Sequence, residues 1–392
     1  MKKTKSVVLI SILSLFFNSF LFSQDKQYQE ALKYISELNR VKAYEILIGI
    51  LKKHPDFSEA HYQTGLINTY FNRDDEAIAN FNNVLSLNKA EVLNASFELS
   101  KQYIKKSEYN SALLLLNSVL EKDVSNDKAL YERARIKNRM LDFNGASDDL
   151  TTAILYNPAD YLYYYQRGLA LIELKNFPGA IQDFDKVINN TKSNPELETG
   201  YFYRGYAYYQ EGLDPKYKGH KGLFHKCLSD YNMCIALDKN DEAAYFNRGE
   251  ANMALNNYIN AISDYKHALL LNPKNYDALY NKAMCNYSLG EIESAVVDMK
   301  KLLVQNPNFT DAYFQLGVWS YESNQTKESI AYFTKLISLE EVHSDAYLFR
   351  GYAFLDENNI TSACQDWVVA DKLGDKEAHR DIIKYCSSLE KK

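Results

Sequence analysis

Small residues recur at a nearly constant spacing along the chain, and the apolar positions around them repeat with the same period. In each of ten units of about 34 residues, an alanine, glycine or serine stands at what we number position eight. A second small residue follows twelve positions later in every unit except the sixth, and a large apolar residue stands four positions beyond it, as in Phe81, Leu150 and Trp367. The residues at position eight are Ala31, Gly65, Ser100, Ala134, Gly168, Gly205, Gly249, Ala283, Gly317 and Gly351. This period predicts stacked pairs of amphipathic helices.

The seventh unit shows how the pattern divides into two helices. We expect a first helix over residues 241–255, a turn at Asn256 and Asn257, and a second helix over residues 258–271. Pro273 then ends the unit, because proline cannot continue a helix and restricts the residue before it. The small residues let the two helices approach closely, so neither helix can bury its apolar stripe without its neighbours.

The repeat predicts one elongated array over residues 24–375, where length alone would suggest two or three domains. A secretory signal at residues 1–23 is expected to precede the array, and a capping helix and tail at residues 376–392 to follow it. The sixth unit carries ten extra residues, at about 211–226, which either extend its first helix or form a loop. The expected units are residues 25–57, 58–91, 92–126, 127–160, 161–196, 197–241, 242–275, 276–309, 310–343 and 344–375.

The pattern resembles the tetratricopeptide repeat (TPR), as in the run from Ala243 to Gly249 followed by Ala261, Tyr265, Ala268 and Pro273. The resemblance covers roughly residues 25–375. It implies an all-α fold, a right-handed superhelical solenoid of about ten helix-turn-helix units with a C-terminal capping helix. It also implies a concave face lined by the first helices and used mainly to bind peptides or proteins. Because the family serves many partners, the resemblance identifies none of them.

Charged residues at two positions vary together from unit to unit. Position seven is basic in six units, and the same six carry aspartate at the equivalent of position 23, whereas the other four lack both charges. We therefore interpret the two residues as an ion pair that holds the first helix to the second, with contact to a ligand as the alternative. The pairs are Arg133 with Asp149, Arg167 with Asp183, Arg204 with Asp230, Arg248 with Asp264, Lys282 with Asp298, and Arg350 with Asp366.

Aromatic residues occupy position five in nine of the ten units, on the helix face that lines the groove in the TPR family. Packing explains such residues as well as ligand binding does. The middle of the array adds further apolar and aromatic residues, and exposed surface of this kind is typical of a binding site. The aromatic candidates for the groove are Tyr131, Tyr165, Phe202, Tyr206, Tyr209 and Phe246.

Four cations follow the groove positions of units three and four: Lys101, Lys105, Arg135 and Arg139. Cations placed side by side repel one another, and Glu98 and Glu132 stand three residues before two of them. A solvated surface is one interpretation. The other is a basic pocket that binds an acidic or carboxylate-bearing segment of a partner.

The five cysteines leave at least one thiol unpaired. Cys364 lies ten residues before Gly374 and Cys386 twelve residues after it. If the last repeat helix ends at Gly374 and a capping helix follows, the two thiols face each other across a hairpin, and we expect a disulfide in an oxidising compartment.

The first residues have the features of a secretory signal. Lys2, Lys3 and Lys5 precede an apolar stretch over residues 7–17, and Ser23 offers a small residue for cleavage before Gln24. We therefore expect an exported protein, periplasmic or extracellular, with no integral membrane segment after cleavage. A retained membrane anchor is the alternative.

No motif of catalysis, metal binding or phosphate binding interrupts the repeat, so we expect no enzyme, no metal and no cofactor. The formal net charge of −6 is unfavourable for binding nucleic acid. The predicted function is a protein–protein interaction scaffold that binds a peptide or protein segment in its concave groove. The alternative is a structural or assembly subunit of a cell-envelope or secretion complex.

Overall fold

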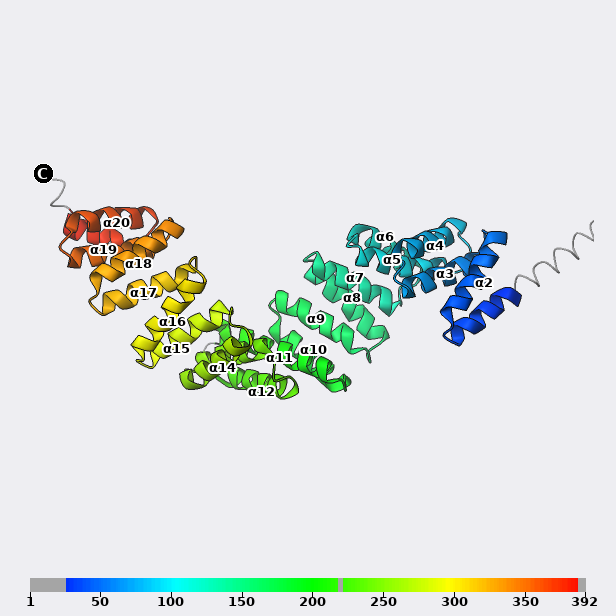
Figure 1. Cartoon of the computed structure of the whole chain (residues 1–392), viewed down its shortest axis with the longest axis horizontal. Helices are drawn as coiled ribbons and strands as arrows, with labels where there is room; N and C mark the ends of the chain where they lie inside the picture. The colour runs from blue at the N-terminus through cyan, green and yellow to red at the C-terminus, as the bar shows by residue number, and fades with distance from the viewer. Residues whose placement is uncertain (1–25, 218–220, 387–392) are drawn as a thin grey trace, which may run out of the picture. The chain divides into compact units, whose positions relative to one another are not determined.

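A computed structural model describes residues 26–217 and 221–386, and in those residues the chain is helical with no β-strand. It forms two compact halves, residues 1–191 and 192–392. Consecutive helices pack against one another in antiparallel pairs within each half (Figure 1). The predicted all-α repeat architecture is therefore confirmed.

The N-terminal half contains repeats one to five. Its first helix covers residues 26–36. The helices that follow are α2 (Arg40–Lys53), α3 (Ser58–Tyr70), α4 (Asp74–Leu87), α5 (Val92–Lys105), α6 (Tyr109–Lys122), α7 (Asp127–Arg139), α8 (Phe143–Tyr156), α9 (Tyr161–Glu173) and α10 (Phe177–Asn190). The expected secretory signal at residues 1–23 lies outside the described residues.

The C-terminal half contains repeats six to ten and the cap. Its helices are α11 (Asn194–Leu213), α12 (Lys221–Leu237), α13 (Glu242–Ala254), α14 (Tyr258–Leu271), α15 (Tyr276–Ser288), α16 (Ile292–Gln305), α17 (Thr310–Glu322), α18 (Thr326–Leu339), α19 (Ser344–Asp356), α20 (Ile360–Lys372) and α21 (Lys376–Asp381). A 3₁₀ turn at Pro215–Tyr217 follows α11, and a π-helical turn at Ile382–Cys386 follows α21.

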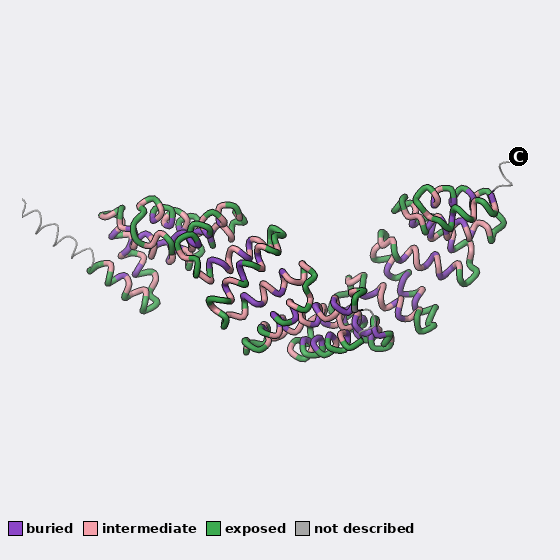
Figure 2. Tube along the Cα trace, turned by 180° about the vertical axis from the view of Figure 1, so that it is seen from behind, coloured by how far each residue is buried: buried purple, intermediate pink, exposed green. Residues whose placement is uncertain are grey.

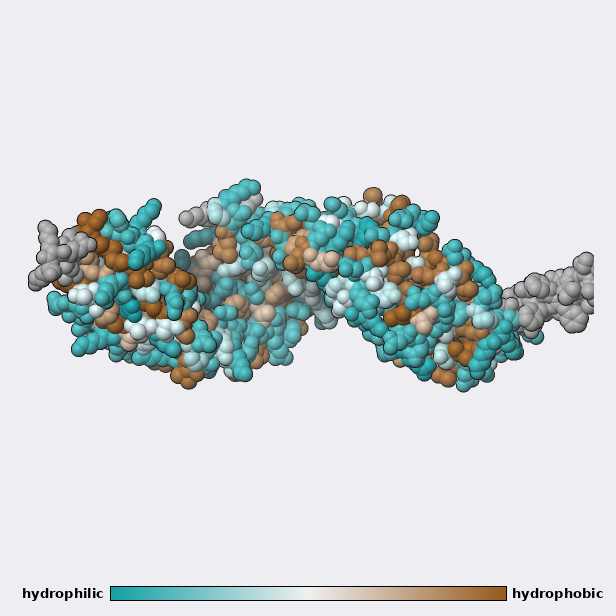
Figure 3. All heavy atoms as spheres, turned by 90° about the horizontal axis from the view of Figure 1, so that it is seen from above, coloured by the Kyte–Doolittle hydropathy of each residue, from teal (hydrophilic) through white to brown (hydrophobic). Residues whose placement is uncertain are grey.

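The small residue at position eight packs directly against the large apolar residue of the second helix. A Cβ atom added to Gly249 would come within 2.7 Å of the Tyr265 ring, and one added to Gly317 equally close to Phe333. Both rings are fully buried. The buried residues accordingly lie between the helices, with exposed residues along the outside (Figure 2). On the surface, hydrophobic residues form small patches among hydrophilic ones (Figure 3).

The turn between the two helices of a repeat depends on one residue in the left-handed backbone region. This residue has a φ between 56° and 81° in every repeat except the sixth, and several members are not glycine, such as Leu141 and Lys175. It ends the first helix and reverses the chain within a few residues. The recurrence of this strained position explains why nine of the ten connections have the same length.

The insertion in repeat six lengthens both helices of that repeat. α11 continues to Leu213 and α12 begins at Lys221, so the described residues of the expected insertion, 211–217 and 221–226, form two helix ends and a 3₁₀ turn. The extended ends pack on each other, because the Tyr209 and Phe224 rings lie 5.8 Å apart and Gly212 contacts Phe224. The expected extension of the first helix therefore accounts for residues 211–213 only, and residues 221–226 instead begin the second helix.

All six ion pairs suggested by the sequence are in contact in the structure, with shortest N–O distances of 2.5 to 2.7 Å. The aspartates are nearly buried, between 2 and 9 % exposed. In Arg133, Arg167 and Arg350, two guanidinium nitrogens donate hydrogen bonds to the two carboxylate oxygens of the aspartate. Such a forked pair fixes the relative position of the two helices.

The arginine also reaches the preceding repeat. The third guanidinium nitrogen donates to an asparagine or threonine two residues after position 23 of the preceding repeat, at 2.7 to 3.0 Å. The acceptors are Asn117, Thr151, Asn232 and Thr334. One side chain therefore joins three helices, and this second contact was not foreseen from the sequence.

A disulfide between Cys364 and Cys386 ties the cap to α20, with the two Cα atoms 5.8 Å apart. The expected capping helix is present as α21, which continues without a break into the π-helical turn. The cap covers the apolar end of the last repeat, since Tyr385 lies 5.7 Å from the buried Trp367 ring. The remaining cysteines, Cys227, Cys234 and Cys285, are buried free thiols.

Candidate functional site

The four cations singled out in repeats three and four lie around one cleft. The cleft has a volume of about 370 Å³ and is formed by the neighbouring first helices α5 and α7. Its lining residues are Lys101, Ile104, Lys105, Ser107, Glu132, Arg135 and Arg139. Because both helices belong to the N-terminal half, the cleft is contained within one compact part of the molecule.

Three of these cations are already paired with a carboxylate. Lys101 lies 2.9 Å from Glu98, and Arg135 lies 2.7 Å from Glu132. Lys105 lies 2.7 Å from Asp74, which begins α4 of the preceding repeat. The first two pairs have the three-residue spacing expected from the sequence, whereas Asp74 is a partner that the sequence analysis missed. Pairing reduces the mutual repulsion of the cations and lowers the positive potential of the cleft.

Arg139 is held differently, because the partner that faces it is a neutral hydroxyl. Its Nη1 donates to the Tyr109 hydroxyl oxygen at 2.9 Å, and the guanidinium lies 5.9 Å from the centre of that ring. Hydrogen bonds from Ser107 and then Arg139 lower the pKa of Tyr109. Arg139 is exposed at the end of α7, so its other donors remain directed to solvent.

The aromatic candidates are half-buried and pack against other rings of their own half. In the N-terminal half, Tyr131 lies 5.3 Å from Tyr163, and Tyr165 lies 6.4 Å from Phe184. In the C-terminal half the equivalent ring pairs are Phe202 with Tyr231 and Phe246 with Tyr265. These contacts show that the aromatic residues support the repeat itself. A continuous aromatic surface across repeats five and six stays a prediction.

The structure adds a polar cluster that the sequence analysis did not identify, centred on Glu250 of α13. Its carboxylate accepts hydrogen bonds from the hydroxyls of Tyr209 and Tyr265, both at 3.3 Å, and from Asn281 at 2.6 Å. The donors come from three successive repeats. One feature of the sequence could have indicated this cluster. Glu250 places a carboxylate at a groove position of a unit that is otherwise rich in apolar residues.

Burial sets the electrostatics of this cluster. It raises the pKa of Glu250 above the usual carboxyl range, although the hydrogen bonds from Tyr209 and Tyr265 oppose the shift. Burial and the nearby Glu250 charge also raise the pKa of Tyr209, so its hydroxyl stays protonated and donates. The arrangement is that of a satisfied structural carboxylate rather than of an acid–base pair.

Metal binding and membrane insertion find no support in the part of the chain that the structure describes. Residues 26–217 and 221–386 bring together no group of three or more His, Cys, Asp or Glu side chains arranged to hold a metal ion. Over the same residues, no helix combines the length and apolar character needed to cross a bilayer.

Three family models described as tetratricopeptide repeat match the chain, over residues 131–196, 242–275, and 277–308 with 311–339. The matched segments fall on the helix pairs described above. The chain is a tetratricopeptide-repeat protein. The family assignment made from the repeat pattern is therefore confirmed, and TPR folds are generally non-catalytic scaffolds for protein interaction.

Similar proteins add support for the fold of this TPR protein. The TPR repeat-containing protein MJ1428 of Methanocaldococcus jannaschii is 28% identical over 222 residues, which are 52% of this chain and 36% of that protein. The match thus spans about a third of the relative's length. The crystal structure of the C-terminal part of a TPR repeat-containing protein from Cytophaga hutchinsonii has 19% identity and a TM-score of 0.51, covering 65% of this chain and 98% of that chain.

The Glu250 cluster generates a prediction about pH. Because the folded-state pKa of Glu250 is raised, the folded chain binds a proton there more readily than the unfolded chain does, and this group lowers stability as pH rises from the usual carboxyl range toward neutrality. Glu250→Gln removes this effect while keeping an acceptor for Tyr209 and Asn281. We expect the free energy of unfolding of the variant, relative to wild type, to improve between pH 4 and pH 7.

Chemical denaturation at the two pH values measures this difference. The exposed Glu341 provides the control, since Glu341→Gln should leave the relative stability nearly independent of pH. A relative stability of Glu250→Gln that worsens with rising pH would contradict the assignment.

Proposed function

We propose that this TPR protein is an exported scaffold that binds a carboxylate-bearing segment of a protein partner on the first helices of repeats three and four. The observation that carries the proposal is the cleft between α5 and α7, where Arg139 faces a neutral hydroxyl while its neighbours are paired with carboxylates. A guanidinium with free donors binds a carboxylate through two parallel hydrogen bonds.

The neighbouring cations also attract an anionic segment, although each already has a carboxylate partner. Lys105 and Arg135 line the same cleft, and both exchange part of their contact with Asp74 and Glu132 when a partner carboxylate approaches. This exchange makes the net gain modest for each contact. Affinity then depends on Arg139 and on apolar contact made alongside it.

Apolar contact is available in the same half of the molecule. Ile104 lines the cleft, and the Tyr131 ring lies 5.6 Å from the Arg135 guanidinium. A bound segment with an apolar residue next to its carboxylate would cover Ile104 and the exposed edge of Tyr131. This combination of a charged anchor with an apolar neighbour is typical of peptide recognition on helical repeats.

Export rests on the sequence of residues 1–23 and is supported by the Cys364–Cys386 disulfide. Disulfides persist mainly in oxidising compartments, whereas the buried thiols of Cys227, Cys234 and Cys285 are protected by the core. We expect protein recovered from the cell envelope or medium to begin at Gln24 and to contain one disulfide. Intact-mass analysis with and without reductant measures both, and a chain that retains Met1 would contradict the proposal.

Replacement of Arg139 tests the binding site. We expect Arg139→Glu to weaken the binding of a short peptide ending in Tyr-Phe with a free C-terminal carboxylate by at least about tenfold, because a charge-assisted hydrogen bond is replaced by repulsion. Titration calorimetry of the full mature chain measures the affinity. The C-terminal amide of the same peptide should bind wild type as weakly as the free acid binds the variant.

Lys122→Glu is the matched control, since Lys122 is an exposed cation of the same half at the end of α6, away from the cleft. It changes the net charge by the same amount and should leave the affinity unchanged. Equal weakening by both substitutions would mean that the peptide responds to overall charge, which would overturn the proposed site.

A further inference from the structure

A second cleft lies in repeats eight and nine, between the second helices of both repeats and the first helix of repeat nine. It has a volume of about 470 Å³ and is formed by α16, α17 and α18. Its accessible apolar residues are Ile292, Val296, Val297 and Tyr332, and the buried Leu316 and Trp319 lie beneath them. It lies within the C-terminal half and shares no residue with the Arg139 cleft.

Comparison with repeat seven explains why this cleft is open. The equivalent place there is a smaller, polar cleft of about 290 Å³, lined by the ion pair of Arg248 and Asp264 and by Asn232 of the preceding repeat. The arginine bridges the two repeats, at 2.6 Å from Asp264 and 2.7 Å from Asn232. In repeat nine the corresponding residues are Leu316, Tyr332 and Lys300, which form no such bridge.

Other repeats that lack the ion pair use different contacts at the same positions. In repeat two, Asn80 replaces the aspartate and lies 3.1 Å from the ring nitrogen Nδ1 of His61. In repeat three, Leu99 and Leu115 belong to one apolar cluster. Loss of the pair therefore does not by itself leave an open cleft, and the cleft of repeat nine is a specific property of its residues.

The walls of the cleft are fixed before any ligand arrives. The Trp319 indole stacks on the Tyr287 ring of the preceding repeat, with centroids 4.4 Å apart and planes 6° from parallel. The Tyr287 hydroxyl in turn donates to Glu322. Trp319 and Leu316 are 3 % and 1 % exposed, so their side chains have little freedom to collapse into the cleft. A site that is already formed loses little entropy when it binds.

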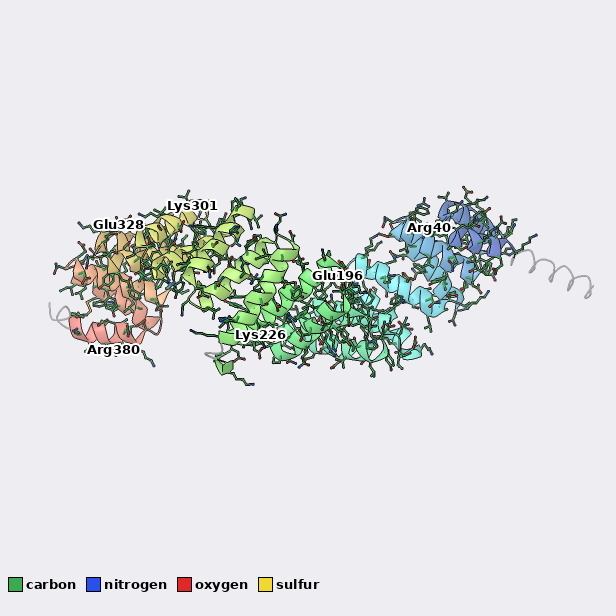
Figure 4. All side chains as sticks on the ribbon, turned by 90° about the horizontal axis from the view of Figure 1, so that it is seen from below. Arg40, Glu196, Lys226, Lys301, Glu328 and Arg380 are labelled. Carbon is green, nitrogen blue, oxygen red and sulfur yellow. A yellow bond between two sulfur atoms is a disulfide. The ribbon has the colours of Figure 1, made fainter. Side chains whose placement is uncertain are left out.

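The rim of the cleft carries a negative excess. Glu293 of α16 and Glu328 of α18 line the cleft with Lys300, the one cation among its lining residues, and all three are exposed. Across residues 26–217 and 221–386, we find no ion pair or side-chain hydrogen bond for any of the three. Glu328 lies on the surface of α18 (Figure 4). Two free carboxylates beside an apolar cavity favour a ligand that is apolar and carries positive charge.

We propose that this cleft binds a partner polypeptide segment in which a large apolar side chain is flanked by lysine or arginine. The apolar side chain lies against Val296, Val297 and Tyr332, above the buried Leu316 and Trp319, and the flanking cation lies against Glu293 or Glu328. The volume accommodates a phenylalanine or leucine side chain with adjoining backbone. This surface is independent of the Arg139 cleft and prefers the opposite charge, so one molecule can hold two different segments.

Trp319 reports directly on the occupation of the cleft. The chain contains two tryptophans, Trp319 and Trp367, and Trp319 alone lines the cleft. We expect the acetylated and amidated tripeptide Arg-Phe-Arg to change the tryptophan emission of the full mature chain in a saturable way. The change should disappear in Trp319→Phe. Glu-Phe-Glu should bind at least about tenfold more weakly by calorimetry, and Arg-Gly-Arg should give no saturable signal.

The repeat itself supplies a variant that closes the cleft. Leu316→Arg with Tyr332→Asp and Lys300→Asn restores the side chains found in repeat seven, and it should abolish binding of Arg-Phe-Arg while the chain still melts cooperatively. Val304→Asp is the control, because Val304 is 83 % exposed on α16 but does not line the cleft. It should leave the affinity unchanged.

Three results would overturn the proposal. These are an unchanged emission of Trp319 at saturating peptide, equal affinity for Arg-Phe-Arg and Glu-Phe-Glu, and loss of binding in Val304→Asp. The comparison of the three peptides on the wild-type chain decides the question even if the triple variant fails to fold. None of these outcomes involves Arg139, so they are distinct from failure of the carboxylate site.

Discussion

The buried ion pair between position seven and its aspartate is the interaction on which the arrangement of this protein depends. The aspartate is nearly buried while the arginine keeps part of its side chain exposed, as in Asp264 (5 %) and Arg248 (23 %). Burial of a charge is costly, and the attraction to its partner compensates only when the geometry is good and the remaining hydrogen bonds are made. Arg248 meets these conditions through Asp264 in its own repeat and Asn232 in the preceding one. The same side chain thus sets both the angle within a repeat and the junction between repeats.

Much of the fold could be predicted because the ten repeats must satisfy the same packing contacts, so equivalent positions can be compared within one sequence. Arg248 and Asp264 vary together in charge from unit to unit, so the sequence alone predicts their contact. The contacts that cross between repeats were harder to foresee. Asn232 and Asn281 look like ordinary surface residues, and their partners become evident only when the stacking is known.

The candidate sites were predicted less completely, for a similar reason. The four cations of repeats three and four could be placed on neighbouring helices from their register, but Asp74 and Tyr109 reach them from other helices. Those partners distinguish Arg139 from the rest. The cleft of repeat nine was missed because the sequence shows which charges are absent and not whether the space is filled. In repeat two, Asn80 at the position of the aspartate makes a hydrogen bond with His61. In repeat nine, Leu316 at the position of the arginine makes no such contact, and a cleft lies beside it.

Both candidate clefts therefore lie where the chain departs from the common repeat pattern. Conserving the ion pair in six repeats keeps the helices in place, and changing it in repeat nine creates an apolar cavity with a charged rim. The cleft of α5 and α7 is lined by four cations, whereas the cleft of α16, α17 and α18 is lined by two carboxylates and one cation. Two clefts of different charge would let the proposed scaffold hold two different segments.

The central claim is that Arg248 and Asp264 act as one unit, and a double-mutant cycle tests it most directly. Free energies of unfolding would be measured for wild type, Arg248→Met, Asp264→Asn and the double variant. We expect each single substitution to be strongly destabilising and the second to cost little more, giving a coupling energy of about 2 kcal/mol. Losses that add within about 0.5 kcal/mol would contradict the account.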